Sequence, residues 1–404
     1  SAAGVAMVGI GMAFARYILL WAPAGEQTAV VQCIGAAPLT FCSHAAPGRR
    51  SPSIGRDIAM RAVTDPREIT RLISTSETAA AVLDTVGQFV NSSTFNQIHV
   101  STAFVKLAKV KSTIEQRDKE SATMIRLANE LRYFLSKRSL TAQISANICW
   151  AIVSMEKQMP QLKPLIPELI PMIQLVAKDM VAQAISNVMW ACARCEIDSG
   201  ASESLFEMLA ERAFMEADSF TAQAIANMFW ASGKLHRRGA PVSPFLDVLP
   251  ILSEVVVQRA SAMTAQDIAN SLRGIADLRH EAPTSELGSD SIPILMDMFI
   301  EKAPQLADRQ IAFDCPEVAL AVAKLQLQPR ALLKTIATRC KTQGVLRQMN
   351  DWGLCAATWS YTDVFQDAEF SDFQNCLRAE VARRGTISEE MIKRSQLGPD
   401  EWQI

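Results

Sequence analysis

Histidine is scarce in this chain, with 4 His among 404 residues. So few imidazoles disfavour a His-rich metal enzyme. The chain also lacks a P-loop, a GxGxxG, a GxSxG and an HExxH motif, and it offers no plausible Ser/His/Asp set. The sequence therefore predicts a protein that is not an enzyme, with no catalytic residues, no metal ligands and no cofactor.

An excess of charge of one sign is also missing. The chain holds 40 Lys+Arg against 42 Asp+Glu, a formal net charge of −2, which excludes a globally basic, histone-like nucleic-acid binder. The 9 Cys are odd in number and irregularly spaced, unlike a secreted disulfide framework. With 49% apolar and 20% charged residues the chain can bury a large core. Composition predicts a soluble, helical protein of a reducing compartment.

One long apolar run is present, over residues 2–24. It is interrupted by Arg16, and residues 1–56 contain a single acid, Glu26, against four Arg. Low acidity with scattered Arg and Ser predicts an organellar targeting region over 1–56, in which a signal-like stretch precedes a transit-like one. The alternative is a membrane anchor, since the run is long enough to span a bilayer. Without this region the net charge is about −5, because four of the 40 bases and one of the 42 acids are removed.

An internal repeat organises the rest of the chain. One motif occurs four times with Gln anchors at 143, 183, 223 and 266, so the period is 40, 40 and 43 residues. Weaker copies lie at 95–109, 313–325 and 350–361. Second amphipathic runs fall between the anchors, at 164–178, 205–217, 244–260, 293–306, 330–342 and 370–384. Two helices per unit of about 40 residues predict an all-α fold, an α-solenoid of stacked helix-turn-helix repeats.

A helical wheel of the motif separates three faces. The face that carries Ile185, Val188 and Met189 is apolar and should pack on the second helix of its own repeat. Its flanks carry small residues such as Ser186, Ala231 and Gly274, which allow neighbouring repeats to approach closely. The remaining line carries Gln, Asn, Trp and a variable residue, and should form one continuous concave surface.

This polar and aromatic line is the predicted RNA-binding site. Amides donate and accept hydrogen bonds, indoles offer stacking faces, and basic residues neutralise phosphates, as in grooves for single-stranded RNA. Its predicted members are Gln143, Asn147, Trp150, Gln183, Asn187, Trp190, Arg194, Gln223, Asn227, Trp230, Lys234, Gln266, Asn270 and Arg273. Residues repeated in every unit cannot read a varying sequence, so specificity would come from the variable positions Ser154, Arg194, Lys234 and Asp277. The alternative is a buried hydrogen-bonded ladder, with Trp as core filler.

The motif carries a resemblance. TAQAIANMFWASGKL (residues 221–235), its sister motifs and the period near 40 resemble the octotricopeptide and heptatricopeptide repeat proteins of algal and alveolate organelles. Residues 95–109 are similar to the region ahead of these repeats in proteins related to the FAST-kinase and RAP-domain group. The resemblance spans roughly 65–365 and is most specific over 140–280. The tail after residue 365 lacks the pattern of a RAP module, which puts any activity of that module in doubt here.

The resemblance implies an organellar RNA-binding protein, with organellar mRNA or rRNA as its partner. Its role would be in transcript stability, processing, translation or ribosome assembly. It would act in the matrix of a mitochondrion rather than in a plastid stroma, and it would not stay inserted in a membrane once the presequence is removed. The second hypothesis is a protein-interaction scaffold or a structural subunit of an organellar ribosome or another large complex. Mild acidity fits that hypothesis at least as well, because RNA contacts need local positive potential.

The predicted organisation has four parts. They are a targeting region over 1–56, a helical lead-in with a degenerate first repeat over 57–139, the repeat solenoid over 140–365, and a capping helix and tail over 366–404. The lead-in should include a charged helix near 111–137. Two smaller motifs are interpreted as structural: Cys192 and Cys195 form a lone CxxC inside a helix, and residues 236–238 (His-Arg-Arg) form a solvated turn.

Overall fold

The computed structural model describes residues 65–195, 199–281, 286–398 and 402. The chain divides into two units, 1–64 and 65–404, and the described residues belong to the second. The targeting region predicted over 1–56 lies outside the described residues. Within them every regular element is a helix and none is a strand, so the all-α prediction is confirmed.

The unit begins with a lead-in of short helices. These are α2 (Pro66–Thr75), α3 (Ala79–Phe89), α4 (Gln97–Lys109), α5 (Gln116–Lys119) and α6 (Ala122–Ser136). The single charged helix predicted near 111–137 is wrong, because two caps interrupt it. Asp118 Oδ2 accepts from the Glu115 backbone N–H at 2.8 Å, and Ser121 Oγ accepts from the Met124 N–H at 3.1 Å, so a new helix starts at Ala122.

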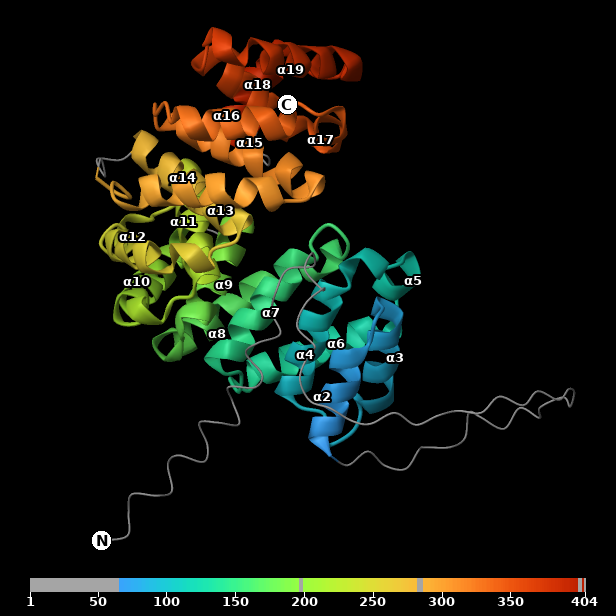
Figure 1. The fold of residues 1–404 in the computed structure, drawn as a ribbon. Coiled ribbons are helices and arrows are strands. Elements are labelled where there is room, and N and C mark those ends of the chain that lie inside the picture. Colours follow the sequence, from blue (N-terminus) through green and yellow to red (C-terminus); the bar gives the residue numbers. More distant parts are fainter. Residues whose placement is uncertain (1–64, 196–198, 282–285, 399–401, 403–404) are drawn as a thin grey trace, which may run out of the picture. The chain divides into compact units, whose positions relative to one another are not determined.

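Helices of the repeated motif then alternate with second helices (Figure 1). The first kind is α7 (Ala142–Ser154), α9 (Ala182–Arg194), α11 (Ala222–Arg237), α13 (Ala265–Glu281), α15 (Asp308–Lys324) and α18 (Asp351–Trp359). The second kind is α8 (Leu165–Val176), α10 (Ser199–Met215), α12 (Val248–Arg259), α14 (Ser291–Lys302), α16 (Arg330–Cys340) and α19 (Ser371–Arg384). The short helices α17 (Gln343–Gln348) and α20 (Glu389–Arg394) complete the set.

Each first helix packs on the next first helix, in the order α4, α7, α9, α11, α13, α15 and α18. The second helices contact one another in a parallel order, from α6 through α8, α10, α12 and α14 to α16. Two layers of helices therefore run side by side along this unit. In such an arrangement, equivalent positions on successive first helices line up on one face.

Local sequence explains where the motif helices start. Thr141 Oγ1 accepts from Ile144 N–H at 3.4 Å, and Thr221 Oγ1 accepts from Ala224 N–H at 3.2 Å. These N-caps satisfy amide groups that a helix start leaves without a partner. The apolar faces are buried as expected: Ile185, Val188 and Met189 have no exposed area.

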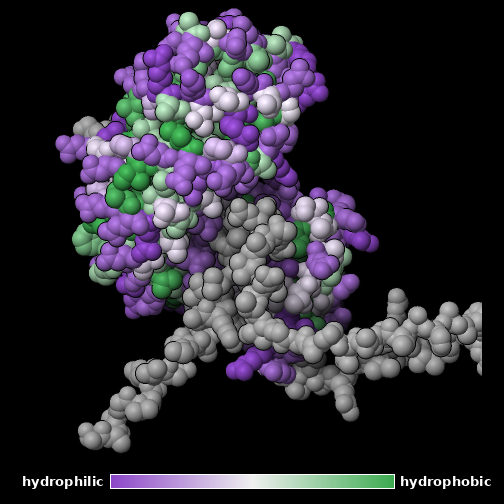
Figure 2. All heavy atoms as spheres, viewed as in Figure 1, coloured by the Kyte–Doolittle hydropathy of each residue, from purple (hydrophilic) through white to green (hydrophobic). Residues whose placement is uncertain are grey.

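No helix in the described part of the chain combines the length and apolar character that a membrane span requires. In the space-filling view the visible face mixes hydrophilic and hydrophobic residues rather than showing one continuous apolar band (Figure 2).

Candidate nucleic-acid interface

Three tryptophans of the motif form a ladder across α7, α9 and α11. The ring centroids of Trp150 and Trp190 lie 6.4 Å apart at an interplanar angle of 43°. Those of Trp190 and Trp230 also lie 6.4 Å apart, stacked at 29°. All three side chains are half-buried. A base inserted between two rings needs roughly 6.8 Å between parallel planes, twice the spacing of stacked bases, so the rings of this tryptophan ladder leave no open slot for a base.

Two predicted site residues lie over ladder rings. The guanidinium carbon of Arg194 is 5.4 Å from the Trp190 ring centroid, and Lys234 Nζ is 5.0 Å from that of Trp230. Such cation–π contacts contribute about 0.5–2 kcal/mol, more when the pair is desolvated. Arg194 is half-buried, whereas Lys234 is 3% exposed. Both cations are therefore held by the ladder, and Arg194 is the one that also reaches the surface.

Basic residues continue from Arg194 towards α4. Lys111 is exposed and its Nζ donates to the Ser154 carbonyl O at 3.1 Å. Burial lowers the pKa of Lys111, and the charge of Arg194 lowers it further. Burial likewise lowers the pKa of the neighbouring Lys109, with a second contribution from Lys106. We call Lys111 and Arg194 the basic row. The two positive charges are close enough to repel each other, which contributes to the lowered pKa of Lys111.

The amides of the motif behave differently from repeat to repeat. Gln143 Nε2 donates to Asn147 Oδ1 at 2.8 Å, and Asn187 Nδ2 donates to the same oxygen at 3.4 Å. Asn187 is 2% exposed, and its Oδ1 is buried without a hydrogen-bond partner. These two bonds join the amides of α7 and α9. Within the described residues the side chains of the remaining motif amides make no such hydrogen bond; these are Gln183, Gln223, Asn227, Gln266 and Asn270.

The fourth motif helix carries charge in the interior instead of an indole at the surface. Arg273 is 3% exposed and donates to both carboxylate oxygens of Asp277, at 3.1 and 3.0 Å. Arg237 and Lys324 also pair with Asp277, at 2.9 and 2.5 Å. Burial alone would raise the pKa of Asp277, but the three cations together hold it below its usual value. Glu317 adds a second carboxylate, 3.3 Å from Arg273. We call these five residues the Asp277 cluster.

The face of α15 and α18 is covered by the chain itself, which the sequence did not reveal. Asn350 caps α18 as Thr141 caps α7, so Trp359 occupies the position of Trp150 and Trp352 that of Gln143. Trp402 packs in a buried cluster with Trp352 and three neighbours, Leu320, Cys355 and Ala356. Trp402, a single tryptophan in a polar tail, was the one feature of the sequence that could have indicated this covering.

The smaller motifs have structural environments. Burial raises the pKa of Cys192 to about 12 and that of Cys195 to about 11, which disfavours the reactive thiolate. The prediction of a solvated turn at residues 236–238 is wrong: His236 and Arg237 belong to α11, and Arg237 pairs with buried Asp277 at 2.9 Å. Arg238 Nη1 donates to the Ala193 carbonyl at 3.1 Å, which ties the end of α11 to α9. Among the described residues no group of three or more His, Cys, Asp or Glu is placed to hold a metal ion.

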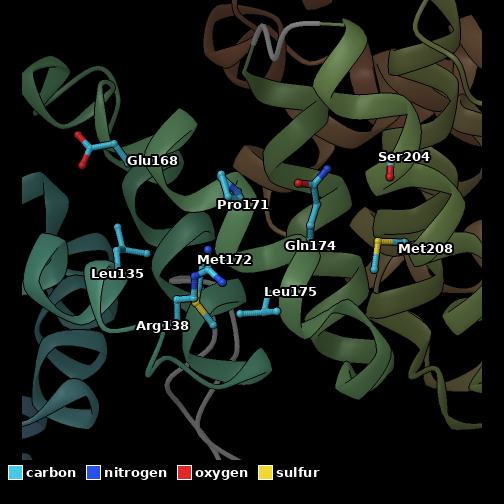
Figure 3. Close-up of a pocket in the computed structure, with 9 residues that line it drawn as sticks. All are labelled: Leu135, Arg138, Glu168, Pro171, Met172, Gln174, Leu175, Ser204 and Met208. Carbon is cyan, nitrogen blue, oxygen red and sulfur yellow. The ribbon is translucent and has the colours of Figure 1, made fainter.

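A cavity of about 430 Å³ lies between the second helices α6, α8 and α10 (Figure 3). Its lining mixes apolar and polar side chains: Leu135, Arg138, Glu168, Pro171, Met172, Gln174, Leu175, Ser204 and Met208. None of them belongs to the tryptophan ladder or the basic row, so the cavity is separate from the candidate interface.

Comparison with known proteins does not assign the chain to a family. No protein-family model matches the chain, and no curated protein matches it significantly.

Proposed function

We propose that this protein is a non-catalytic RNA-binding protein, built as an α-solenoid of helix pairs of about 40 residues. Single-stranded RNA would run along the face formed by the tryptophan ladder and the basic row. The observation that carries the proposal is the placement of Arg194, whose guanidinium carbon lies 5.4 Å from the Trp190 ring centroid. An aromatic surface bordered by cations is what a nucleic-acid strand requires.

Each part of the surface would contact a different part of the strand. Lys111 and Arg194 would neutralise phosphates. Gln183 and Gln223, which are half-buried, would offer amides to base edges. The tryptophans would support bases on their exposed edges, since their spacing of 6.4 Å leaves no slot between rings.

A local positive charge would answer the objection raised by the net charge of −2. RNA affinity depends on the potential at the contact surface, and Lys111 and Arg194 would supply positive charge next to the ladder. Arg273 is not needed for this contact, because Asp277 and Glu317 already pair with it. The variable contacts that give sequence preference would then come from Ser154 and Arg194.

The cellular setting follows from the resemblance of the motif and belongs to the same proposal. The protein would act on organellar mRNA or rRNA, in transcript stability, processing, translation or ribosome assembly, in the mitochondrial matrix rather than the plastid stroma.

The test is fluorescence anisotropy of a labelled mixed-sequence single-stranded RNA across a salt series. Lys111→Glu with Arg194→Glu should weaken binding at least about tenfold and flatten the salt dependence, because two phosphate contacts are lost. Lys341→Glu is the matched control, since Lys341 is also exposed but follows α16, a second helix. Equal affinity of the double variant and the control would contradict the proposal.

A second candidate is a scaffold that binds an extended polypeptide. The observation in its favour is that the chain's own C-terminal residues cover the equivalent face on α15 and α18. If the protein binds no RNA at low salt, recovery of specific protein partners that is lost in the Arg194→Glu variant would support this function instead.

A further inference from the structure

Exposed apolar side chains gather on the second helices. Among the described residues ten large apolar side chains are exposed, and six of these lie on α6, α8, α10 and α12: Ile125, Tyr133, Leu175, Phe214, Met215 and Val257. The other four are scattered over the rest of the described chain. Monomeric soluble proteins rarely concentrate exposed apolar residues in one region unless a partner binds there. The layer of second helices is therefore a candidate interaction surface.

Three apolar residues occupy equivalent places on successive second helices. They lie six residues before the N-caps Thr141, Val181 and Thr221, and are Leu135, Leu175 and Met215. Contacts of α6 with α8 and of α8 with α10 place the three on adjacent helices. Leu135 is half-buried, whereas Leu175 is 49% and Met215 64% exposed. We call these three residues the outer apolar row.

The outer apolar row borders the cavity between α6, α8 and α10. Leu135 and Leu175 line this cavity together with Met172 and Met208. Figure 3 shows Leu175 between these two methionines. Methionine side chains adapt their shape readily to what packs against them. The surface is therefore hollowed where it is most apolar, and it can receive an apolar side chain from a partner.

Charge of opposite sign lies at the two ends of the outer apolar row. The exposed cations at the α6 end are Arg126, Lys137 and Arg138, against one half-buried acid, Glu130. The exposed acids on α10 are Glu203, Glu207 and Glu211. Lys137 Nζ lies 5.7 Å from the Tyr133 ring centroid, a contact that leaves its charge in place. The α6 end is therefore basic and the α10 end acidic.

The other charges of the three helices do not change this polarity. Arg132 pairs with Glu168 at 3.0 Å between α6 and α8, and Arg212 pairs with Glu216 at the end of α10. The turn after α8 adds one charge of each sign. These charges cancel one another, so the difference between the basic and the acidic end remains.

We infer that the face formed by the outer apolar row and its two charged ends binds a second copy of this chain. A two-fold axis near Leu175 would set the basic end of each copy against the acidic end of the other and lay the two apolar rows on each other. Such a contact needs only one self-complementary patch. A patch with charge of one sign would repel its own copy, whereas opposite charges at the two ends attract it and fix its orientation.

The contact does not depend on RNA binding, because the tryptophan ladder lies on first helices and the outer apolar row on second helices. The two surfaces share no residue. Dimerisation can therefore be measured without RNA, and its outcome leaves the proposed function to its own test.

Sedimentation equilibrium of the full chain without RNA tests the inference. We expect a monomer of 44.3 kDa to give way to a species of twice that mass between about 1 and about 100 μM. Leu175→Glu should raise the dissociation constant at least about tenfold, because it places a carboxylate at the centre of the apolar contact. Ile98→Glu is the matched control and should dimerise as wild type does, since Ile98 is an exposed apolar residue of α4, a first helix.

Exchange of the charges tests the orientation of the two copies. Lys137→Glu with Arg138→Glu sets acids against acids at both ends of the contact, and should weaken the dimer about tenfold. Glu207→Lys with Glu211→Lys sets cations against cations and should weaken it similarly. The chain that carries all four changes should dimerise again, because opposite charges then face each other with the ends exchanged. All four residues are exposed, and circular dichroism checks that each variant is folded.

Three results would overturn the inference. The first is a wild-type chain that stays at 44.3 kDa up to about 100 μM. The second is a dimer that Leu175→Glu leaves intact, and the third is a fourfold charge variant that dimerises no better than the two double variants. If the wild type is monomeric and a different protein binds it in a manner that Leu175→Glu abolishes, the face belongs to that other polypeptide and not to a second copy.

Discussion

Gly233 and Gly274 face each other across α11 and α13. A Cβ on Gly233 would lie 2.7 Å from the Gly274 carbonyl O, and a Cβ on Gly274 would lie 2.1 Å from the Phe229 carbonyl O. Real Cβ atoms do not approach backbone that closely, so the two helices are in contact through their main chains. This contact sets the spacing between the helix that ends the tryptophan ladder and the helix that begins the Asp277 cluster.

Gly274→Ala should therefore destabilise the protein by about 3 kcal/mol or more, because α11 and α13 must separate to admit the methyl group. Urea denaturation followed by circular dichroism measures the effect. Gly344→Ala in α17 is the control, since its Cβ would meet Asp308 Oδ2 at an ordinary 3.5 Å. A Gly274→Ala variant as stable as that control would contradict the close approach.

Asp277 balances three cations in the interior. Asp277→Asn should cost about 3–5 kcal/mol, because Arg237, Arg273 and Lys324 would be left without their shared carboxylate. Glu68→Gln provides the comparison on an exposed pair, Arg71 with Glu68 at 2.6 Å, and should leave the denaturation midpoint nearly unchanged because water screens that pair. Similar denaturation midpoints for the two variants would rule out the cluster as a stabilising centre.

Stability should also depend on pH through Asp314. Burial raises its pKa to about 7, with further contributions from Glu317 and Asp267. A carboxyl group with a raised pKa favours the folded state only while protonated, so its contribution is lost as pH rises from about 4 through 7. Asp314→Asn should gain about 1–2 kcal/mol more stability at pH 8 than at pH 5, relative to wild type.

The matched control for this measurement is Asp308→Asn, at the exposed start of the same helix, which removes the same carboxylate charge without the burial of Asp314. Thermal unfolding at the two pH values measures the stability of both variants. A gain for Asp314→Asn that is equal at both values would refute the raised pKa as its cause.

The tryptophan ladder can be removed without emptying the core, because its rings are half-buried. Trp190→Ala with Trp230→Ala should leave a folded helical protein and weaken binding of single-stranded RNA by about tenfold, through loss of base contacts. Circular dichroism and anisotropy on the same sample give both readouts. If the double variant aggregates while Arg194→Glu binds RNA normally, the ladder is core and the assignment of the site fails.

Most of the features that the sequence could predict follow from the periodicity of the motif. The Gln anchors located α7, α9, α11 and α13, and the wheel placed Ile185 and Met189 inside and small residues such as Gly274 at the helix contacts. These features depend on spacing within one helix, which a sequence displays directly.

Features that depend on partners distant in the chain could not be predicted in the same way. Lys324 lies 47 residues after Asp277, and the Gln396 carbonyl lies 123 residues after Arg273. The burial of Lys234 and Arg273 and the covering of α18 by Trp402 follow from such long-range packing. The motif alone therefore assigned surface roles to two cations that the fold buries.

The central claim is that single-stranded RNA lies on the tryptophan ladder. Photocrosslinking of the full chain to a 4-thiouridine RNA, followed by mass spectrometry of the adducts, tests it most directly. We expect crosslinks to Trp150, Trp190 and Trp230 or to peptides that contain them, and fewer of them in the variant that combines Lys111→Glu with Arg194→Glu. Crosslinks confined to the second helices, or none at low salt, would contradict it.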